Sequence, residues 1–178
     1  QNLIVAGVPA RQKQRIESLA RAHGLLAEGH SPLRLGAIAC VAFPTCPQAM
    51  AEAERYFPDL LTRIEVLAAR HGLERQELVI RMTGCPNGCA RPFLAEIAFV
   101  GKGPGTYNLL LGGDGRGARL NRLYRENIGE TEILNELDGL FARFAAERLP
   151  DEGFGDFVVR VGIVRRVVNA ARDFHDAS

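Results

Sequence analysis

Four cysteines in two turn-rich segments constrain this chain more than any other feature of its sequence. Cys40 and Cys46 lie in CVAFPTCPQ, whereas Cys85 and Cys89 lie in GCPNGCARP, so the spacings are Cys-x5-Cys and Cys-x3-Cys. Each segment follows a short apolar run that is typical of a strand. The fold must therefore hold two proline- and glycine-rich loops, each with two thiols, at the ends of strands.

The setting of these thiols favours ligands over structural roles. The chain begins QNLIVAGVPA, with no signal-peptide pattern, so we expect a cytoplasmic protein, and disulfides are rare in that compartment. Structural zinc usually takes cysteine pairs about two to four residues apart, which the first pair does not match. Buried inert cysteines account poorly for four thiols in turns. Thiolates that converge from two loops fit an iron–sulfur cluster.

The neighbours of the cysteines support this interpretation. Proline follows Cys46 and Cys85 directly, and it presets the backbone for a turn. Gly84 and Gly88 carry no Cβ, so the main chain there can come close to a bulky group. Thiolates at such turns can accept backbone N–H bonds, which stabilise their charge.

Hydrophobic periodicity predicts an α+β (or α/β) domain with a mixed β-sheet flanked by helices. Helices are expected over 8–23, 47–57, 58–71 and 130–148. Strands are expected over 33–39, 77–83, 94–100, 107–111 and 118–124, with the glycine-rich GGDGRG as a hairpin turn between the last two. The apolar stretch 154–168 fits either period. We expect residues 1–178 to form a single domain, the C-terminal part of a longer protein.

Composition argues against two classes of partner. The net charge is +1, tryptophan is absent and only three tyrosines occur, which disfavours a nucleic-acid surface. No apolar run approaches the ~18–20 residues of a membrane span. We therefore expect neither a nucleic-acid nor a membrane partner.

Longer stretches around the cysteines resemble a known family. The segments ACVAFPTCPQAMAEAER (39–55) and RMTGCPNGCARP (81–92) resemble the cluster-binding region of siroheme sulfite and nitrite reductases. The segments LAEIAFVGKGPGTYNLLLGG (94–113), RLYREN (122–127) and GFGDFVVRVGIVR (153–165) are similar to the C-terminal half of bacterial NADPH-type sulfite reductase hemoproteins. The resemblance implies the 4Fe–4S domain-like fold of the nitrite/sulfite reductases.

The resemblance also implies a role for each cysteine. Cys40, Cys46 and Cys85 would ligate a [4Fe–4S] cluster only. Cys89 would ligate the same cluster and bridge through its sulfur to the siroheme iron, which makes it the catalytic cysteine of this chain. A shared thiolate would place an electron reservoir in direct contact with the iron that holds the substrate.

Polar residues near the ligands are candidates for siroheme contacts. Asn87 lies between two of the cysteines, although a turn residue that bonds its own backbone is an equally good interpretation. Siroheme carries carboxylates, and arginine suits bidentate carboxylate binding. Arg91 is therefore a cofactor-binding candidate, and Arg55 and Arg81 are further candidates that could equally be structural.

By resemblance, the chain is part of an assimilatory sulfite reductase, which carries out the six-electron reduction of sulfite to sulfide in cysteine biosynthesis. Electrons would come from NADPH through a flavoprotein subunit to the cluster and siroheme. Most substrate-binding residues would lie outside this chain, so the chain alone should be inactive and could lack its cofactors. Two alternatives remain: a siroheme nitrite reductase, and a non-catalytic four-cysteine metal or electron-transfer module.

Overall fold

The computed structural model describes residues 4–26 and 29–173, and its contacts group the chain into two compact units. One unit is Gln1–His30, and the other is Ser31–Ser178. The expectation that residues 1–178 form a single domain of a longer hemoprotein stays a prediction. Each unit is described below by itself.

The first unit is helical, as its periodicity predicted. A 3-10 turn, η1 (Ala10–Gln12), leads into helix α1 (Lys13–Ala22). Gly24 follows the end of this helix, and its φ of 64° lies in the left-handed region that glycine adopts readily. The N–H groups of Gly24 and Leu25 donate to the carbonyls of Arg21 and Ala20, which satisfies the last turn.

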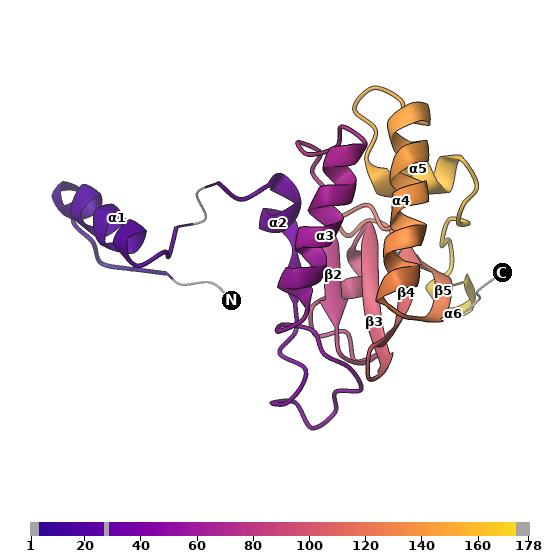
Figure 1. The fold of residues 1–178 in the computed structure, drawn as a ribbon, viewed down its shortest axis with the longest axis horizontal. Coiled ribbons are helices and arrows are strands. Elements are labelled where there is room, and N and C mark those ends of the chain that lie inside the picture. The colour runs from indigo at the N-terminus through magenta and orange to yellow at the C-terminus, as the bar shows by residue number, and fades with distance from the viewer. Residues whose placement is uncertain (1–3, 27–28, 174–178) are drawn as a thin grey trace. The chain divides into compact units, whose positions relative to one another are not determined.

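The second unit contains a five-stranded mixed sheet, which confirms the predicted fold class (Figure 1). Its strands lie in the sheet in chain order: β1 (Ile38–Ala39), β2 (Ile80–Thr83), β3 (Ile97–Gly103), β4 (Thr106–Leu111) and β5 (Arg122–Ile128). The pairs β1–β2 and β2–β3 are parallel, whereas β3–β4 and β4–β5 are antiparallel. The parallel half of the sheet carries the cysteines at its strand ends.

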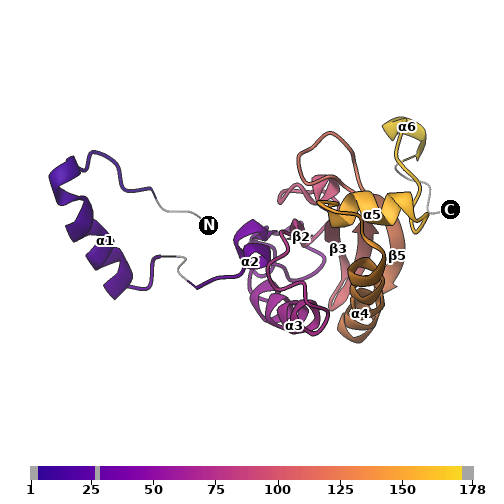
Figure 2. The same ribbon diagram turned by 90° about the horizontal axis from the view of Figure 1, so that it is seen from above.

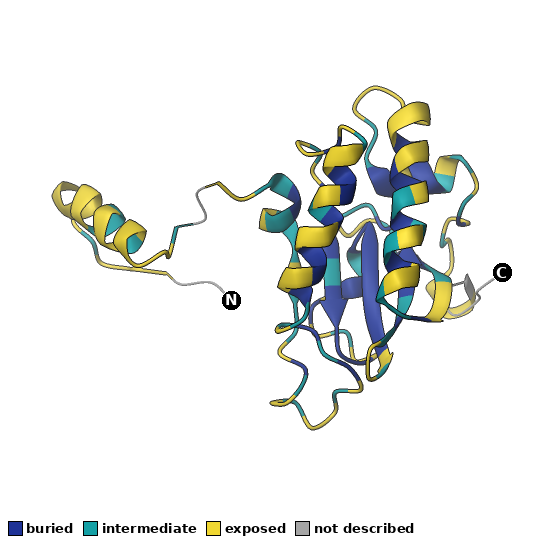
Figure 3. Cartoon of the chain, viewed as in Figure 1, coloured by how far each residue is buried: buried dark blue, intermediate teal, exposed yellow. Residues whose placement is uncertain are grey.

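Helices α3 (Phe57–Arg70) and α4 (Glu130–Glu147) lie side by side on one face of this sheet (Figures 1 and 2). The side chains between these helices and the sheet form the main core, and Figure 3 shows that the buried side of each helix faces the strands. Helix α5 (Phe154–Arg160) adds phenylalanines to the same core, and α6 (Ala170–Asp173) follows it. A smaller apolar cluster, Ala95, Ala98, Val100 and Leu110, comes from the other face of the sheet.

The strand predicted over 33–39 is mostly wrong. A short helix, α2 (Pro32–Gly36), occupies most of it, and only Ile38–Ala39 is extended. Ser31 caps this helix, because its Oγ accepts a hydrogen bond of 3.1 Å from the N–H of Arg34. Pro32 stands in the first turn, where its missing N–H costs nothing.

The helix predicted over 47–57 is also wrong, since residues 40–56 run through consecutive turns and bends. The N–H groups of Met50 and Ala51 donate to the carbonyl of Gly84, and that of Glu54 donates to the carbonyl of Cys40. Those long-range bonds replace the local bonds that a helix requires. The helix predicted over 58–71 is confirmed as α3, one residue earlier than expected.

The remaining elements match the predictions with shifted ends. Strands β2 and β4 and helix α4 lie within or against the predicted ranges, and α5 settles the ambiguous start of 154–168 as helical. Strand β3 begins later than expected, because a 3-10 turn, η2 (Pro92–Leu94), comes first. Strand β5 begins at Arg122, because the Asp114 carboxylate accepts N–H bonds from Arg116, Gly117 and Ala118 and keeps the hairpin connection in a loop.

Among the described residues, no helix is both long enough and apolar enough to cross a bilayer.

Candidate functional site

Two loops carry the four cysteines, and the sheet brings the loops together. We call residues 40–51 the first cysteine loop and residues 84–92 the second cysteine loop. They follow β1 and β2, which are parallel, so both leave the same edge of the sheet. Ala39 pairs with Met82 in the sheet, and the N–H of Cys40 donates to the carbonyl of Met82 at 3.1 Å. The predicted placement of both cysteine pairs at strand ends is confirmed.

Gly84 joins the two loops through its backbone. Its N–H donates to Sγ of Cys40 at 3.2 Å, and its carbonyl accepts from the N–H groups of Met50 and Ala51 at 2.8 and 3.0 Å. The hydroxyl of Thr83 also donates to Sγ of Cys40, at 3.4 Å. Two donors from the end of β2 thus bind one sulfur atom of the first cysteine loop.

The loops pack closely enough that glycine is required where they meet. A Cβ on Gly84 would lie 2.6 Å from Cβ of Ala42 and 2.7 Å from the carbonyl oxygen of Ala51. A Cβ on Gly101, in β3, would lie 2.4 Å from the carbonyl oxygen of Gly84. All three distances are shorter than real contacts allow, so these two glycines permit the two loops and the sheet to approach closely.

The four thiols differ in exposure. Cys85 is buried, Cys40 and Cys46 are half-buried, and Cys89 is exposed; all four are free thiols. Within residues 4–26 and 29–173, no three His, Cys, Asp or Glu side chains are arranged to hold a single metal ion. The ligands of a [4Fe–4S] cluster each bind a different iron, so they do not need to converge on one point. A [4Fe–4S] cluster takes four cysteine sulfur atoms as ligands, and the two joined loops carry four free thiols.

The second cysteine loop is closed by backbone contacts. The N–H of Arg91 donates to the carbonyl of Gly88 at 2.7 Å, and Nη1 of Arg81 donates to the carbonyl of Arg91 at 2.9 Å. Arg91 itself has a φ of 51°, in the left-handed region that is uncommon for residues other than glycine. The ring of Phe93 lies so close to Gly88 that a Cβ there would be 2.8 Å from it.

The candidate siroheme contacts have different surroundings. Asn87 is exposed, and its side chain donates to Oε1 of Gln48, so it links the two loops rather than bonding its own backbone. Arg91 is exposed and forms no ion pair within the described residues. The expected siroheme contacts of both residues stay predictions. Arg55 pairs with the carboxylate of Glu52, so its charge is already balanced.

Arg81 carries a positive charge on the sheet beside the second cysteine loop. Partial burial lowers its pKa, and the positive charge of the nearby Arg91 lowers it further. Its Nε is buried and has no hydrogen-bond partner among the described residues. Because the Nη1 of this side chain bonds the carbonyl of Arg91, the structural role of Arg81 is evident, and a role toward siroheme stays a prediction.

One supporting residue was missed from the sequence. Tyr107, in β4, is buried, and its hydroxyl donates to the carbonyl of Glu52 at 2.9 Å. Its ring stacks on Tyr56 with centroids 5.8 Å apart. Burial raises the pKa of Tyr107 to about 12, so the hydroxyl stays protonated at neutral pH and keeps donating. The signal that could have found it was a polar aromatic residue on the core-facing side of a strand.

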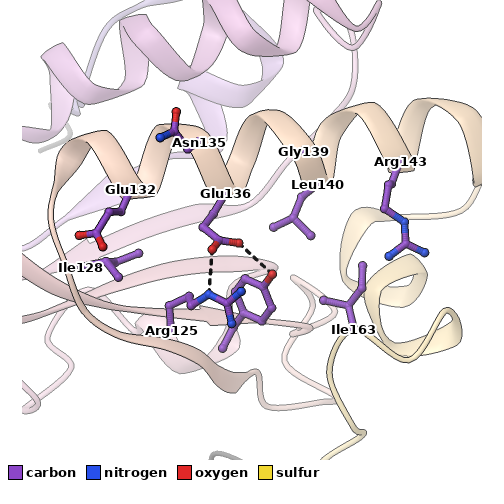
Figure 4. Close-up of a pocket in the computed structure, with 10 residues that line it drawn as sticks. Arg125, Ile128, Glu132, Asn135, Glu136, Gly139, Leu140, Arg143 and Ile163 are labelled. Carbon is purple, nitrogen blue, oxygen red and sulfur yellow. Dashed lines mark hydrogen bonds and ion pairs between the residues drawn. The ribbon is translucent and has the colours of Figure 1, made fainter.

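A hollow of about 520 Å³ lies between α4 and β5, away from the cysteines in sequence (Figure 4). In it, the Glu136 carboxylate accepts bonds from the Tyr124 hydroxyl and from Nε of Arg125, at 2.9 and 2.8 Å. Both of its oxygens thus already have partners within the protein. Gly139 also lines the hollow, and a Cβ there would meet nothing within 4 Å.

Comparison with solved structures supports the fold. The chain is similar to the NirA protein of Mycobacterium tuberculosis, with a TM-score of 0.70 over 88% of this chain and 30% of that one. Sequence identity in that comparison is 23%, so it bears on the fold alone. No protein-family model matches the chain.

Comparison with curated proteins gives a much higher identity. The chain is 62% identical over 175 residues to the sulfite reductase (NADPH) hemoprotein beta-component of Shewanella loihica, 62% over 176 residues to that of Shewanella sediminis, and 61% over 175 residues to that of Shewanella baltica. These matches cover 98 or 99% of the chain but only 31% of each relative. The chain is thus homologous, over nearly its whole length, to the sulfite reductase (NADPH) hemoprotein beta-component, and it spans about a third of such a protein.

Proposed function

We propose that this chain supplies the cluster-binding part of a siroheme-dependent sulfite reductase. In this proposal Cys40, Cys46, Cys85 and Cys89 ligate a [4Fe–4S] cluster, and Cys89 also bridges to the siroheme iron. The observation that carries the proposal is the junction at Gly84, which holds two cysteine loops together at one edge of the sheet. The homology to sulfite reductase hemoproteins supports the identity of the cofactors.

The exposure of the thiols suits these roles. Cys85 is buried and Cys89 is exposed, although they share one loop. A thiolate that bridges to a second cofactor must be open to a group outside its own loop, and Cys89 meets that condition. When bound, the cluster would supply electrons to the siroheme through the shared sulfur.

The surrounding protein tunes the thiolates. Hydrogen bonds to ligand sulfur atoms, together with shielding from water, set the reduction potential of an iron–sulfur cluster. The Gly84 N–H and the Thr83 hydroxyl both donate to Sγ of Cys40, so this ligand would be hydrogen-bonded when it holds the cluster. Burial of Cys85 keeps water from another of the proposed ligands.

The activity of the whole protein is part of the proposal. Sulfite would be reduced to sulfide, with electrons from NADPH delivered in the cytoplasm by a flavoprotein subunit. Because the chain spans 31% of its relatives, most residues that bind sulfite and siroheme are expected elsewhere in the protein. We expect the isolated chain to be inactive even with siroheme and an artificial electron donor.

The test is the cofactor content of the full-length hemoprotein. We expect one siroheme and four cluster irons per chain, measured by metal analysis with anaerobic optical and EPR spectra. Cys85→Ser should lose the cluster, while Thr45→Ser, an exposed change beside Cys46, should keep it. Cys89→Ser should abolish the spectroscopic coupling between cluster and siroheme.

Two results would contradict the proposal. One is a single tightly bound zinc per chain without iron, which would identify a structural metal module. The other is turnover of nitrite with no reduction of sulfite in steady-state assays, which would identify a nitrite reductase that uses the same cofactors.

A further inference from the structure

Asn121 anchors the far end of the second cysteine loop. It lies just before β5 and is fully buried. Its side-chain Nδ2 donates to the carbonyls of Pro92 and Ala95 at 2.8 and 3.0 Å, and its backbone N–H donates to the carbonyl of Phe93 at 2.9 Å. One residue thus binds three carbonyls of the segment that includes η2, immediately after the cysteines.

The orientation of this amide is fixed by its partners. Carbonyl oxygens only accept hydrogen bonds, so the NH2 end must face Pro92 and Ala95, and a flipped amide would set oxygen against oxygen. Oδ1 of Asn121 is then buried, with no hydrogen-bond partner in the part of the chain that the structure describes. An unpartnered buried carbonyl is costly. The fold accepts this cost at the residue whose side chain holds η2 in place.

Contacts lead from η2 back to Cys89. The ring of Phe93 packs against Gly88, the residue before Cys89. On the other side, the N–H of Arg91 donates to the carbonyl of Gly88, which closes the turn around Cys89. Ala90, between them, is buried. The exposed thiol therefore sits on a backbone that is fixed before and after it.

The two ends of the second cysteine loop are held in different ways. At Gly84 the holding groups belong to the first cysteine loop. At Pro92, Phe93 and Ala95 they belong to Asn121, which comes from the hairpin connection on the antiparallel side of the sheet. Removing Asn121 should therefore release the end with Cys89 and leave the junction at Gly84 in place.

We propose that Asn121 is a positioning residue for Cys89: by binding the carbonyls of η2, it fixes the backbone that aims this thiol. The link to cofactors rests on the proposed function, in which Cys89 bridges cluster and siroheme. Asn121 touches neither cofactor in this proposal. It acts through Phe93 and Gly88, so its loss should change the coupling between the cofactors more than their presence.

The first test uses the 178-residue chain without cofactors. Asn121→Leu keeps the approximate shape, removes both donors and also removes the unpartnered Oδ1. Cysteine alkylation is followed residue by residue by mass spectrometry under anaerobic conditions. Cys89 is already exposed, so release of its end of the loop is read at Cys85, which lies buried in the same loop. We expect Cys85 to react on the order of tenfold faster, as expected when buried hydrogen bonds are lost, while Cys46 in the first cysteine loop stays within about twofold of its original rate.

A matched control separates this effect from general loosening. Asn108→Leu is the same substitution in β4, and it removes one bond from the backbone N–H of Asn127 to Oδ1 of Asn108. Its bond does not involve the cysteine loops, so the alkylation rates of Cys85 and Cys46 should not change. Equal acceleration of Cys85 and Cys46 in Asn121→Leu, or equal acceleration of Cys85 in both variants, would overturn the proposal. Should Asn121→Leu not fold, Asn121→Ser, which keeps a smaller polar group, takes its place with the same criteria.

The second test uses the full-length hemoprotein. We expect Asn121→Leu to retain its iron and siroheme but to shift the siroheme midpoint potential and alter the EPR signal of the ferric siroheme, with Asn108→Leu as control. Unchanged potential and EPR signal, with full cofactor content, would overturn the role toward Cys89. If the full-length protein carries neither cofactor, the proposed function fails, and the alkylation pattern alone decides whether Asn121 holds the end of the loop that carries Cys89.

Discussion

The core beneath α3 and α4 and the two cysteine loops are held by different kinds of interaction. The core consists of apolar side chains, such as Phe141, Phe144, Phe154 and Phe157, packed between helices and sheet. The cysteine loops have few such side chains and depend on backbone hydrogen bonds at Gly84 and on glycines that permit close approach. The stability of the core therefore depends on how much apolar area it buries. The arrangement of the cysteine loops depends on the positions of individual backbone atoms.

This difference has a physical consequence. Apolar burial is non-directional, so a core accepts substitutions that conserve volume. A carbonyl that accepts two N–H bonds, as that of Gly84 does, requires its donors at defined positions. Substitutions in the core should lower the stability of the whole unit, whereas those in the loops should change the local arrangement of the thiols as well.

The largest expected effect is in the core. Phe144 is fully buried, and its ring lies 5.5 Å from Phe154 and 5.2 Å from Phe157, centroid to centroid. Phe144→Ala should lower the free energy of unfolding by about 3–5 kcal/mol through lost burial and a cavity. Chemical denaturation of the chain measures it. Native-state alkylation of Cys85, relative to that of Cys46, should not change, and a selective rise would contradict the separation of the two regions. Phe144→Leu, a smaller truncation with the same expected sign, serves if the alanine variant does not fold.

A smaller effect on stability is expected at the junction of the loops. Gly84→Ala would place a Cβ against Cβ of Ala42 and the carbonyl oxygen of Ala51, so backbone must move. Such overpacking should destabilise the chain by about 1–3 kcal/mol. It should also accelerate the alkylation of Cys40, which loses its bond from the Gly84 N–H as the loops separate. Destabilisation with unchanged reactivity of Cys40 would mean that the junction does not hold this thiol.

A pH effect is expected where the second cysteine loop runs into β3. Glu96 is buried, and its carboxylate accepts bonds from the N–H groups of Val79 and Gly155 at 2.9 and 3.0 Å. Burial raises its pKa above 4.5; the nearby Asp156 charge also raises it, and the two backbone bonds oppose the shift only partly. The folded chain thus holds this proton at a pH where the unfolded chain has lost it.

Stability from Glu96 should consequently fall as pH rises through its raised pKa, and it should be greatest near pH 4.5 and below. The measurement is the free energy of unfolding against pH for the native chain and for Glu96→Gln, which cannot ionise. The native chain should gain stability relative to the variant as the pH is lowered from neutral. A difference that does not vary with pH would show that Glu96 does not titrate in this window.

The smallest expected effect is a gain in stability. Gly139 lies inside α4, and a Cβ there would meet nothing within 4 Å. Gly139→Ala should raise the free energy of unfolding by about 0.5–1 kcal/mol, because glycine loses more backbone freedom in a helix than alanine does. Thermal denaturation measures it. Gly84→Ala should instead lower the free energy of unfolding. A change of the same sign at both positions would contradict the contrast between the helix and the cysteine loops.

Much of the fold could be predicted because its signals are local. The apolar stripe of α4, the alternation in β4 and the turn residues at 84–92 each specify structure within a few residues. The helix predicted over 47–57 failed because the N–H groups of Met50 and Ala51 bind Gly84, which is distant in sequence. The strand predicted over 33–39 failed because the cap at Ser31 outweighed the apolar run.

The candidate site also has a part that the sequence predicted and a part that it did not. Composition and spacing were sufficient to single out the four cysteines as candidate ligands, and their ligand role stays a prediction. They could not indicate that Asn87 bonds Gln48, that Tyr107 supports Glu52, or that Asn121 binds the carbonyls after Cys89. In each case the partner is contributed by a segment far away in the chain, and no local pattern predicts it.

The sequence by itself determined the number and spacing of the thiols, the turns that carry them and the strand that precedes the second pair. Only the tertiary structure decided that the two loops meet at Gly84, that Cys85 is buried, and that Cys89 faces outward. The physical reason is that turn chemistry acts over neighbouring residues, whereas contacts between loops depend on strand register. Register is set by which side chains the sheet buries, and it places distant backbone groups within hydrogen-bonding distance.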